Sequence, residues 1–397
     1  KVTFHRLLNI FRRPFNYRKE NLGTKFSHKL VKIFNLARKM KIYIDEKIPH
    51  SEHFFHSFNL ETEKFSDSSF EIEKLDEPCV VVVRSTYKTH KRNVPECVKY
   101  LCSVSTGEDH IDKQSLERKN IKYGFSTGAN AIAVQEYFYS CLSKLILENK
   151  YDPRKDKILI IGAGNIGAGI KNVLDHFNIK SDTYDPFKDS SLDSLNNLSA
   201  YKLITLHVPY TETGDHPTKY LVDASFLSKL SKGTVIINTS RGGVVSEEDF
   251  LHSKDLFLIS DVFEGEPNLS LKFCEKNYYF TPHIAGHSQF SRYAMTRMAF
   301  HNVADYLNID VIEPESILVK KEENQTKETI NDFKNFLFPV SLILKTYNFT
   351  KDVFEPSSFK KIRDDYNDRV GFSQVNIKDC NDPQIKKSLE ILGFKVI

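Results

Sequence analysis

The chain has 397 residues, of which 40% are hydrophobic and 27% charged, a balance typical of a globular protein with about two to three domains. No apolar run approaches the roughly 18 residues that a membrane helix needs, so we expect no membrane-spanning segment. The six cysteines are scattered without CxxC spacing, which argues against a disulfide scaffold and a metal cluster and favours a reduced, cytoplasmic protein.

The positive charge is concentrated at the amino end. Residues 1–39 hold eleven Lys or Arg and one acid, a net charge of +10, so residues 40–397 carry −6 although the whole chain carries +4. A mildly acidic body argues against nucleic acid as the main ligand. We expect residues 1–39 to be a basic leader outside the fold, either disordered or lying before the true start at Met40. A targeting segment is the alternative, because the leader contains Arg and few acids.

From Met40 onward, short apolar runs alternate with helical patterns, which predicts parallel α/β units. The first strands are expected at residues 42–44, 80–83 and 102–104, followed by a long helix over 130–147. Further strands are expected at residues 158–161, 183–184, 203–206, 235–237 and 257–259, with a last one leading into Thr281. A helix is expected over 288–307, a charged linker over 320–328 and a smaller unit over 330–397.

The strand at 158–161 runs directly into Gly162, Gly164 and Gly167. At this spacing the first glycine makes a tight turn, the second lets the backbone approach a pyrophosphate, and the third lets the helix pack on the strand. The phosphates would lie at the helix N-terminus, where free N–H groups favour anions. Asp185 follows the next strand, at the distance where a carboxylate accepts hydrogen bonds from ribose hydroxyls. The sequence therefore predicts a dinucleotide site.

Three more polar stretches follow predicted strands, at the sheet edge where open α/β sheets bind ligands. Arg241 stands among small residues, and its planar fork suits the carboxylate of an acid substrate. Glu266 lies in an acidic loop, and His283 follows the last strand. A histidine with a carboxylate on its second ring nitrogen is a common general acid/base.

The ordered set GAGNIG, Asp185, NTSRGG, DVFEGEP and TPHIAG resembles the D-isomer-specific 2-hydroxyacid dehydrogenases, which are NAD-dependent enzymes. The resemblance implies a doubly wound parallel-sheet Rossmann domain inserted in a split flavodoxin-like substrate domain. It implies the following division: substrate domain 40–129, NAD-binding domain 130–286, return helix 287–319, then a linker and a small α/β C-terminal dimerisation domain over 320–397.

Within that family the chain is most similar to a member that oxidises a phosphorylated 2-hydroxy acid. This similarity spans residues 40–397 and rests on amino-terminal segments and on the tail segment 359–369 with the closing Leu392-Gly-Phe394. It implies a homodimer. The tail's Phe333, Phe338 and Leu342, with their apolar neighbours, support that expectation, because about 70 residues seldom hide so much apolar surface.

Residue roles also come from the resemblance. His283 would move the proton of the 2-hydroxyl, Glu266 would orient His283, and Arg241 would hold the substrate. Serines in small-residue turns suit substrate binding, and we add Arg84 as a candidate for the phosphate. His287 stands where this member usually has tyrosine, which puts substrate affinity at that position in doubt. The cofactor-binding candidates are Gly162, Gly164, Asn165, Ile166, Gly167, Asp185, Val208, Thr239, Ser240, Arg241, Asp261 and Gly286, and the substrate candidates are Arg84, Ser85, Ser105 and His287.

Singly, these residues have ordinary explanations: Arg241 as a surface charge, Glu266 as a solvated loop acid and His283 as a core histidine. His283 and His287 have the i, i+4 spacing of a metal pair, but no third ligand cluster is visible and we expect no metal. Two other functions stay open. One is the same chemistry on another acid, such as 3-phosphoglycerate; the other is an NAD-sensing binding protein of the same superfamily.

Overall fold

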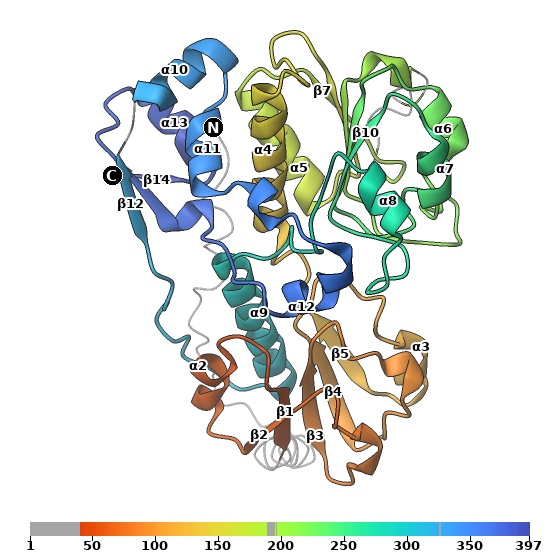
Figure 1. The fold of residues 1–397 in the computed structure, drawn as a ribbon. Coiled ribbons are helices and arrows are strands. Elements are labelled where there is room, and N and C mark those ends of the chain that lie inside the picture. The colour runs from red at the N-terminus through yellow and green to blue at the C-terminus, as the bar shows by residue number, and fades with distance from the viewer. Residues whose placement is uncertain (1–39, 189–194, 196, 325–326) are drawn as a thin grey trace, which may run out of the picture.

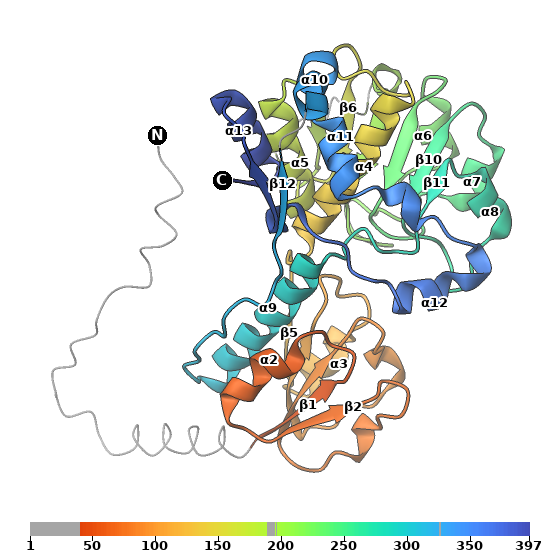
Figure 2. The ribbon, with the colours of Figure 1, turned by 60° about the vertical axis from the view of Figure 1, so that its left-hand side comes forward.

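The computed structural model describes residues 40–188, 195, 197–324 and 327–397; the leader expected over 1–39 lies outside them. Figure 1 shows two lobes, with one parallel sheet in the lower lobe and a larger one in the upper lobe. The carboxyl-terminal elements lie against the upper lobe, as Figure 2 shows from a second direction. Within the described ranges, no helix is long and apolar enough to cross a membrane.

The first sheet has five parallel strands in the order β2-β1-β3-β4-β5. Alternate valines of the central strand face opposite cores, which is why this strand is apolar throughout. The fourth strand begins earlier than expected, and the second and fifth, both edge strands, were not predicted. The bounds are β1 Lys41–Asp45, β2 Thr62–Phe65, β3 Cys79–Val83, β4 Val98–Ser103 and β5 Lys122–Phe125, with helices α2 Ser51–Phe55 and α3 Lys113–Arg118.

The second sheet has six parallel strands in the order β11-β10-β9-β8-β6-β7. Ile158 and Ile160 pack toward α4 and α5, whereas Leu159 and Ile161 pack toward α6, α7 and α8, so helices cover both faces. The predicted α/β class with a doubly wound parallel sheet is confirmed. The bounds are α4 Ala131–Leu147, β6 Ile158–Ile161, α5 Asn165–His176, β7 Ser181–Tyr184, β8 Leu203–Leu206, α6 Ala224–Ser228, β9 Val235–Asn238, α7 Glu247–His252, β10 Phe257–Ser260, α8 Leu271–Lys276 and β11 Tyr279–Phe280.

Helix α9 (Gln289–Leu307) returns the chain from the second sheet to the first. A capping box at Ser288 and Ser291 starts it, because each hydroxyl accepts from the other residue's backbone N–H. Its Phe300 and Val303 are fully buried in the core of the first sheet. The return helix is therefore part of the core of the first lobe.

The carboxyl-terminal unit has a small parallel sheet, β12-β13-β14, and four helices in its described part. The charged stretch expected to be a linker instead contains β12, which pairs with β13 along its length. Cross-strand pairing with a buried neighbour overrides the poor strand propensity of Lys321–Asn324. The bounds are β12 Lys321–Asn324, α10 Lys327–Phe336, α11 Val340–Thr346, α12 Phe359–Asp364, β13 Val375–Lys378, α13 Pro383–Ile391 and β14 Lys395–Val396.

The apolar residues of this unit are used inside the same chain. Phe338 and Ile343 are fully buried in one cluster with Tyr139 and Leu142 of α4. The hydroxyl of Ser140 donates to the carbonyl of Tyr347 at 2.9 Å. The unit was expected to hold more apolar surface than it could bury alone, and these residues are buried by covering the outer face of α4. The unit and the second sheet share one core.

Candidate active site

The glycine-rich turn lies between β6 and α5. Gly162 has a φ of 97°, and a Cβ there would collide with the carbonyl of His207. A Cβ on Gly167 would collide with the Gly162 carbonyl, so the third glycine lets the helix lie against the strand. Gly164 differs, because nothing lies within 4 Å of where its Cβ would be. The turn thus closes on itself at two glycines and leaves the middle one open to a ligand, which fits a pyrophosphate.

Beside the turn, Asp185 follows β7. Its Oδ2 accepts the N–H of Ala163 at 2.9 Å and its Oδ1 the N–H of Phe187 at 3.1 Å, so the carboxylate is fixed where ribose hydroxyls would reach it. Asn165 opens α5. Ile166 packs its side chain against the core, so its backbone is the part available at the turn.

The loops after β8 and β9 form the next part of this edge. The N–H of Val208 donates to the buried hydroxyl of Ser240 at 3.1 Å, and Thr239 Oγ1 lies 3.2 Å from His207 Nδ1. Gly286 lies on the opposite loop against Asn130, whose Nδ2 would be 2.6 Å from a Cβ at 286. These candidates sit at the carboxyl ends of the strands, as predicted for a cofactor cleft.

His283 and Glu266 form a direct pair, with Nδ1 and Oε2 2.7 Å apart. Burial opposes ionisation of Glu266. The nearby His283, its hydrogen bond, Arg363 and the N–H of Phe263 outweigh burial and hold the pKa of this carboxyl below its usual value. An ionised carboxylate only accepts, so Nδ1 of His283 carries the proton and Nε2 is left to exchange a proton with a substrate.

The loop that carries His283 is held by Asp261. Oδ1 accepts the hydroxyl of Thr281 at 2.6 Å and the N–H of Ile284 at 2.8 Å, and Oδ2 accepts the N–H of Ala285 at 2.9 Å. Burial raises the pKa of Asp261 to about 6. Asp261 was predicted to line the cofactor, but all three hydrogen bonds of its side chain go to this loop. They fix His283 in a left-handed conformation with a φ of 59°.

Arg241 follows β9 and reaches across to the first lobe. One of its terminal nitrogens lies 2.8 Å from the carbonyl of Ser240, and the other lies 3.5 Å from Asp109 Oδ1. A Cβ on Gly107 would collide with this second nitrogen. The guanidinium therefore lies directly on the loop after β4, where the two lobes meet. With its side chain 35% exposed, it can still bind a carboxylate.

The substrate-domain candidates lie at the carboxyl ends of β3 and β4. Ser105 is buried and donates to the carbonyl of Gly107 at 2.8 Å, so it shapes the loop that touches Arg241. Ser85 is exposed in the turn after β3. Arg84, our candidate for the substrate phosphate, donates its Nε to Oδ2 of the fully buried Asp45 at 2.9 Å. That ion pair offsets the charge that a phosphate would need.

The sequence reasoning missed Arg369, which enters the site from the carboxyl-terminal unit. Its buried guanidinium donates to the carbonyls of Ile284 at 3.1 Å, Ala285 at 2.8 Å and Ala133 at 2.6 Å, and also to that of His287. It therefore holds the loop that follows His283. The available signal was indirect: Glu136, an acid within the apolar pattern of α4, indicated a buried cation nearby.

His287, predicted to contact the substrate, lies on this clamped loop. Its ring is 6.1 Å from that of Tyr366, and Nδ1 is buried without a hydrogen-bond partner. Burial and then the charges of neighbouring arginines and His283 lower the pKa of His287 well below its usual value. Among the described residues, no group of three or more His, Cys, Asp or Glu side chains is arranged to hold a metal ion.

Comparison with known proteins identifies the family of the chain. Residues 144–285 match the model of the D-isomer specific 2-hydroxyacid dehydrogenase, NAD binding domain. An erythronate-4-phosphate dehydrogenase from a Marinomonas species is 33% identical over 282 residues, covering 68% of this chain and 74% of that protein. One from Pseudoalteromonas translucida is 28% identical over 377 residues, covering 90% and 100%. The NAD⁺-bound 3-phosphoglycerate dehydrogenase of Entamoeba histolytica has a similar fold, with a TM-score of 0.58, 21% identity and coverage of 71% and 100%.

The nucleotide turn, the His283–Glu266 pair and the facing Arg241 thus define an NAD-dependent dehydrogenase of the D-isomer-specific 2-hydroxyacid class. Within that class, the chain belongs to the erythronate-4-phosphate dehydrogenase family.

Proposed function

We propose that the protein oxidises 4-phospho-D-erythronate at C2 to (R)-3-hydroxy-2-oxo-4-phosphooxybutanoate, a step in the formation of pyridoxal 5′-phosphate (vitamin B6). The names of its relatives support the substrate. The observation that carries the chemistry is the 2.7 Å pair of His283 and Glu266 beside Arg241, at the edge where the nucleotide turn lies.

His283 acts as the general base. Its Nε2 accepts the proton of the 2-hydroxyl, and the resulting imidazolium is stabilised by the carboxylate of Glu266. Bound NAD supplies the acceptor for the hydride that leaves C2. The products are the 2-oxo acid, NADH and the proton that His283 returns to solvent.

Arg241 positions the acid. Its two terminal nitrogens can face both oxygens of the C1 carboxylate, which fixes C2 relative to His283. Because Arg241 contacts the Gly107 loop of the other lobe, binding of the substrate by Arg241 is coupled to closure of the two lobes. Ser85, Ser105 and His287 complete the proposed substrate contacts, and Gly162, Gly164, Asp185, Val208 and Thr239 are among the proposed cofactor contacts.

A substrate panel tests this function. Purified protein would be assayed by NADH absorbance, in both directions, with 4-phosphoerythronate, 3-phosphoglycerate, D-lactate and unphosphorylated erythronate. We expect the highest kcat/KM for 4-phosphoerythronate. A higher value for 3-phosphoglycerate would assign the same chemistry to another substrate, and NAD binding without turnover of any acid would favour the sensing protein.

We also propose a cytoplasmic homodimer whose two-fold contact lies in residues 320–397, which the family resemblance supports. Since α11 covers α4 of its own chain, the pairing surface would be another face of that unit. Sedimentation of the intact chain is the test. A truncation at Val319 would uncover α4 and could not separate loss of pairing from loss of fold. A monomer at micromolar concentration would contradict the proposal.

A further inference from the structure

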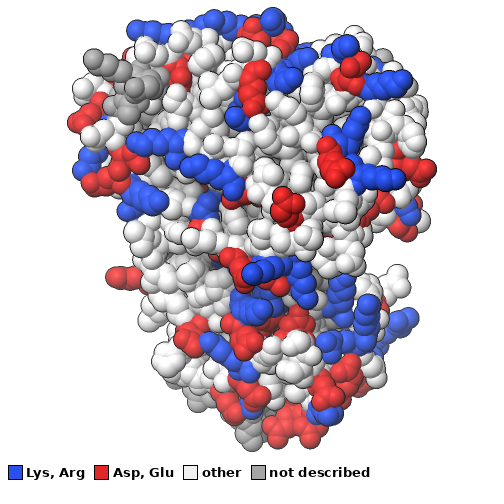
Figure 3. All heavy atoms as spheres, in the orientation of Figure 1, with Lys and Arg blue, Asp and Glu red and all other residues white. Residues whose placement is uncertain are grey.

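Helix α12 and the segment after it cross the waist between the two lobes, as Figures 1 and 2 show. In this region Arg363 approaches the catalytic pair: one guanidinium nitrogen lies 3.8 Å from Glu266 Oε2. Its side chain is 27% exposed. Basic side chains, with acidic ones among them, gather at this height of the molecule in Figure 3. A cation from the carboxyl-terminal unit therefore stands beside the residues that act on C2.

Arg363 is weakly engaged where it stands. The oxygens of Glu266 already accept Nδ1 of His283 at 2.7 Å and the N–H of Phe263 at 2.9 Å. A distance of 3.8 Å is too long for a hydrogen bond. Within the described part of the chain, Arg363 has no other ion pair and no hydrogen bond. Its five N–H donors are thus available to a ligand.

The other arginines around the site are occupied. Nε of Arg84 donates to Asp45 at 2.9 Å, and Nε of Arg292 donates to Asp368 at 3.1 Å. The terminal nitrogens of Arg369 donate to backbone carbonyls. Of these five arginines, Arg241 and Arg363 are the two that make no short ion pair with a carboxylate. Neither of them donates to a set of backbone carbonyls outside its own turn. Arg241 follows β9, whereas Arg363 lies on α12 and approaches Glu266.

A substrate with two anionic groups matches this arrangement. Arg241 takes the carboxylate next to C2, and the second anion would lie beyond the His283–Glu266 pair. Of the three arginines that act on His287 there, Arg292 is paired with Asp368 and Arg369 with backbone carbonyls, so Arg363 is the one whose charge has no close partner. A phosphate would pair with this guanidinium, which binds phosphate oxygens as a fork.

We propose that Arg363 binds the phosphate of the substrate and makes the carboxyl-terminal unit a determinant of substrate specificity. This inference rests on the proposed function, since it concerns the phosphate of the same substrate. It replaces Arg84, whose charge is offset by Asp45, as the main phosphate ligand.

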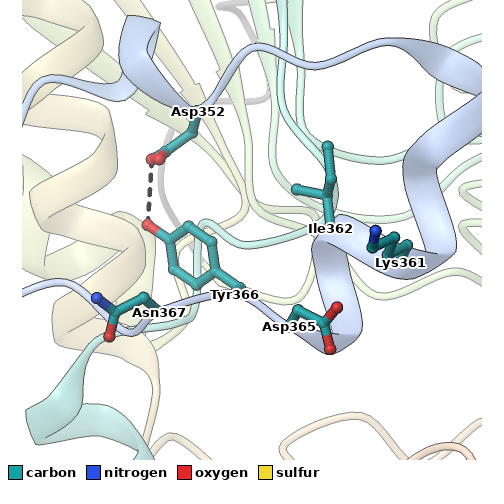
Figure 4. A pocket seen from close by; sticks show the side chains of 6 residues that line it. All are labelled: Asp352, Lys361, Ile362, Asp365, Tyr366 and Asn367. Carbon is teal, nitrogen blue, oxygen red and sulfur yellow. Dashed lines mark hydrogen bonds between the residues drawn. The ribbon is translucent and has the colours of Figure 1, made fainter.

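Lys361 offers a matched control on the same helix. It lines a cavity of about 350 Å³ that Arg363 does not line. Figure 4 shows this cavity, where Tyr366 donates to Asp352 at 3.1 Å. Lys361→Ala removes the same charge from α12 without touching the catalytic pair.

The test compares 4-phosphoerythronate with unphosphorylated erythronate in the parent, Arg363→Ala, Arg363→Lys and Lys361→Ala. Because Arg363→Ala removes a charged hydrogen-bond donor, we expect kcat/KM for the phosphorylated acid to fall by about 10- to 100-fold, mostly through a higher KM. The loss for erythronate should be at least about tenfold smaller. Inorganic phosphate should compete with substrate in the parent and less well in Arg363→Ala. Arg363→Lys should be intermediate, and Lys361→Ala should match the parent.

An equal loss of kcat/KM on both acids in Arg363→Ala would overturn the inference and indicate that Arg363 supports Glu266. No loss of kcat/KM on either acid would also overturn it. If the parent prefers 3-phosphoglycerate, the proposed function fails. The role of Arg363 would then be tested by comparing 3-phosphoglycerate with glycerate in the same variants. A parent with no preference for any phosphorylated acid would overturn both.

Discussion

Arg241 and Gly107 come from different lobes, and the guanidinium of one fills the space that a side chain on the other would need. The contact gives a reason for a glycine in the loop after β4: its missing Cβ lets the guanidinium of Arg241 approach the backbone.

Gly107→Ala should therefore displace Arg241. Because the overlapping atom is the end of a flexible side chain, the fold should survive, and the cost should fall on substrate binding. We expect KM for the acid to rise by about tenfold with cofactor affinity unchanged. Steady-state kinetics and cofactor titration would measure both. Gly214→Ala, in a loop with open space around its Cβ, is the control, although its φ of 106° adds strain. An unchanged KM in Gly107→Ala would mean that Arg241 does not hold the acid.

His283→Asn should abolish turnover and leave cofactor binding nearly intact. General acid/base catalysis contributes about 10²- to 10⁴-fold, so a loss in this range is expected. Glu266→Gln should be milder, because the amide still accepts from Nδ1 but no longer stabilises imidazolium. Turnover of His283→Asn within a few-fold of the parent would refute the mechanism.

NAD should bind more tightly than NADP. Asp185 is fixed by two backbone N–H groups, and a 2′-phosphate beside it would cost several kcal/mol in like-charge repulsion. The nearest cation in the sequence, Lys188, donates to the carbonyl of Ala163. Asp185→Ser should reduce the preference for NAD over NADP. The chain has no Trp, so titration should follow the fluorescence of NADH and NADPH. Tighter NADPH binding by the parent would contradict the assignment.

Glu247 gives a stability prediction. Burial, together with the carboxylates of Glu264 and Glu266, raises its pKa to about 7, above its ordinary value of 4.5. Between these values the folded protein holds the proton more tightly than the unfolded chain, so this group's contribution to stability falls as the pH rises from 4.5 to about 7 and stays low above it. Glu247→Gln should be more stable than the parent at about pH 8, by about 1 kcal/mol after solvent screening, and equal to it near pH 4. Denaturant unfolding at both pH values would measure this. The exposed Glu248→Gln should show no such difference.

The sequence patterns predicted the parts of this fold that depend on local chemistry. Buried strands such as β6 are apolar on both faces, and glycines 162, 164 and 167 have spacings that few other structures require. The edge strands β2 and β5 were not predicted, because they are short and mixed in polarity. The strand β12 was missed because it is charged, and its partner lies more than 50 residues away in the chain.

The same contrast between local patterns and distant partners applies to the site. His283, Glu266 and Arg241 could be predicted because each directly follows a strand of one sheet. Arg369 and Arg363 could not, since their positions depend on how a distant unit packs against the second sheet. The pattern of segment 359–369 suggested a relative but no position in space.

Arg369→Met should slow turnover as well as destabilise the fold. The substitution leaves the carbonyls of Ile284, Ala285, His287 and Ala133 without their charged donor, and Glu136 without its neighbouring cation. Removing one partner of a buried charge typically costs about 3–5 kcal/mol. At a temperature where circular dichroism shows the variant folded, kcat should still fall by about tenfold or more, since the loop no longer holds His283 against Glu266.

Arg154→Met is the matched control for that variant. Arg154 also donates to a backbone carbonyl across the boundary between the carboxyl-terminal unit and the second sheet, that of Lys334 at 2.5 Å, but on the exposed surface away from the site. It should leave kcat unchanged. Arg369→Lys keeps the charge with a single donor head that cannot span four carbonyls, so its kcat should lie between parent and Arg369→Met. Full kcat in folded Arg369→Met would limit Arg369 to stability. A fall shared with Arg154→Met would mean that docking of the unit, rather than the clamp on this loop, sets the rate.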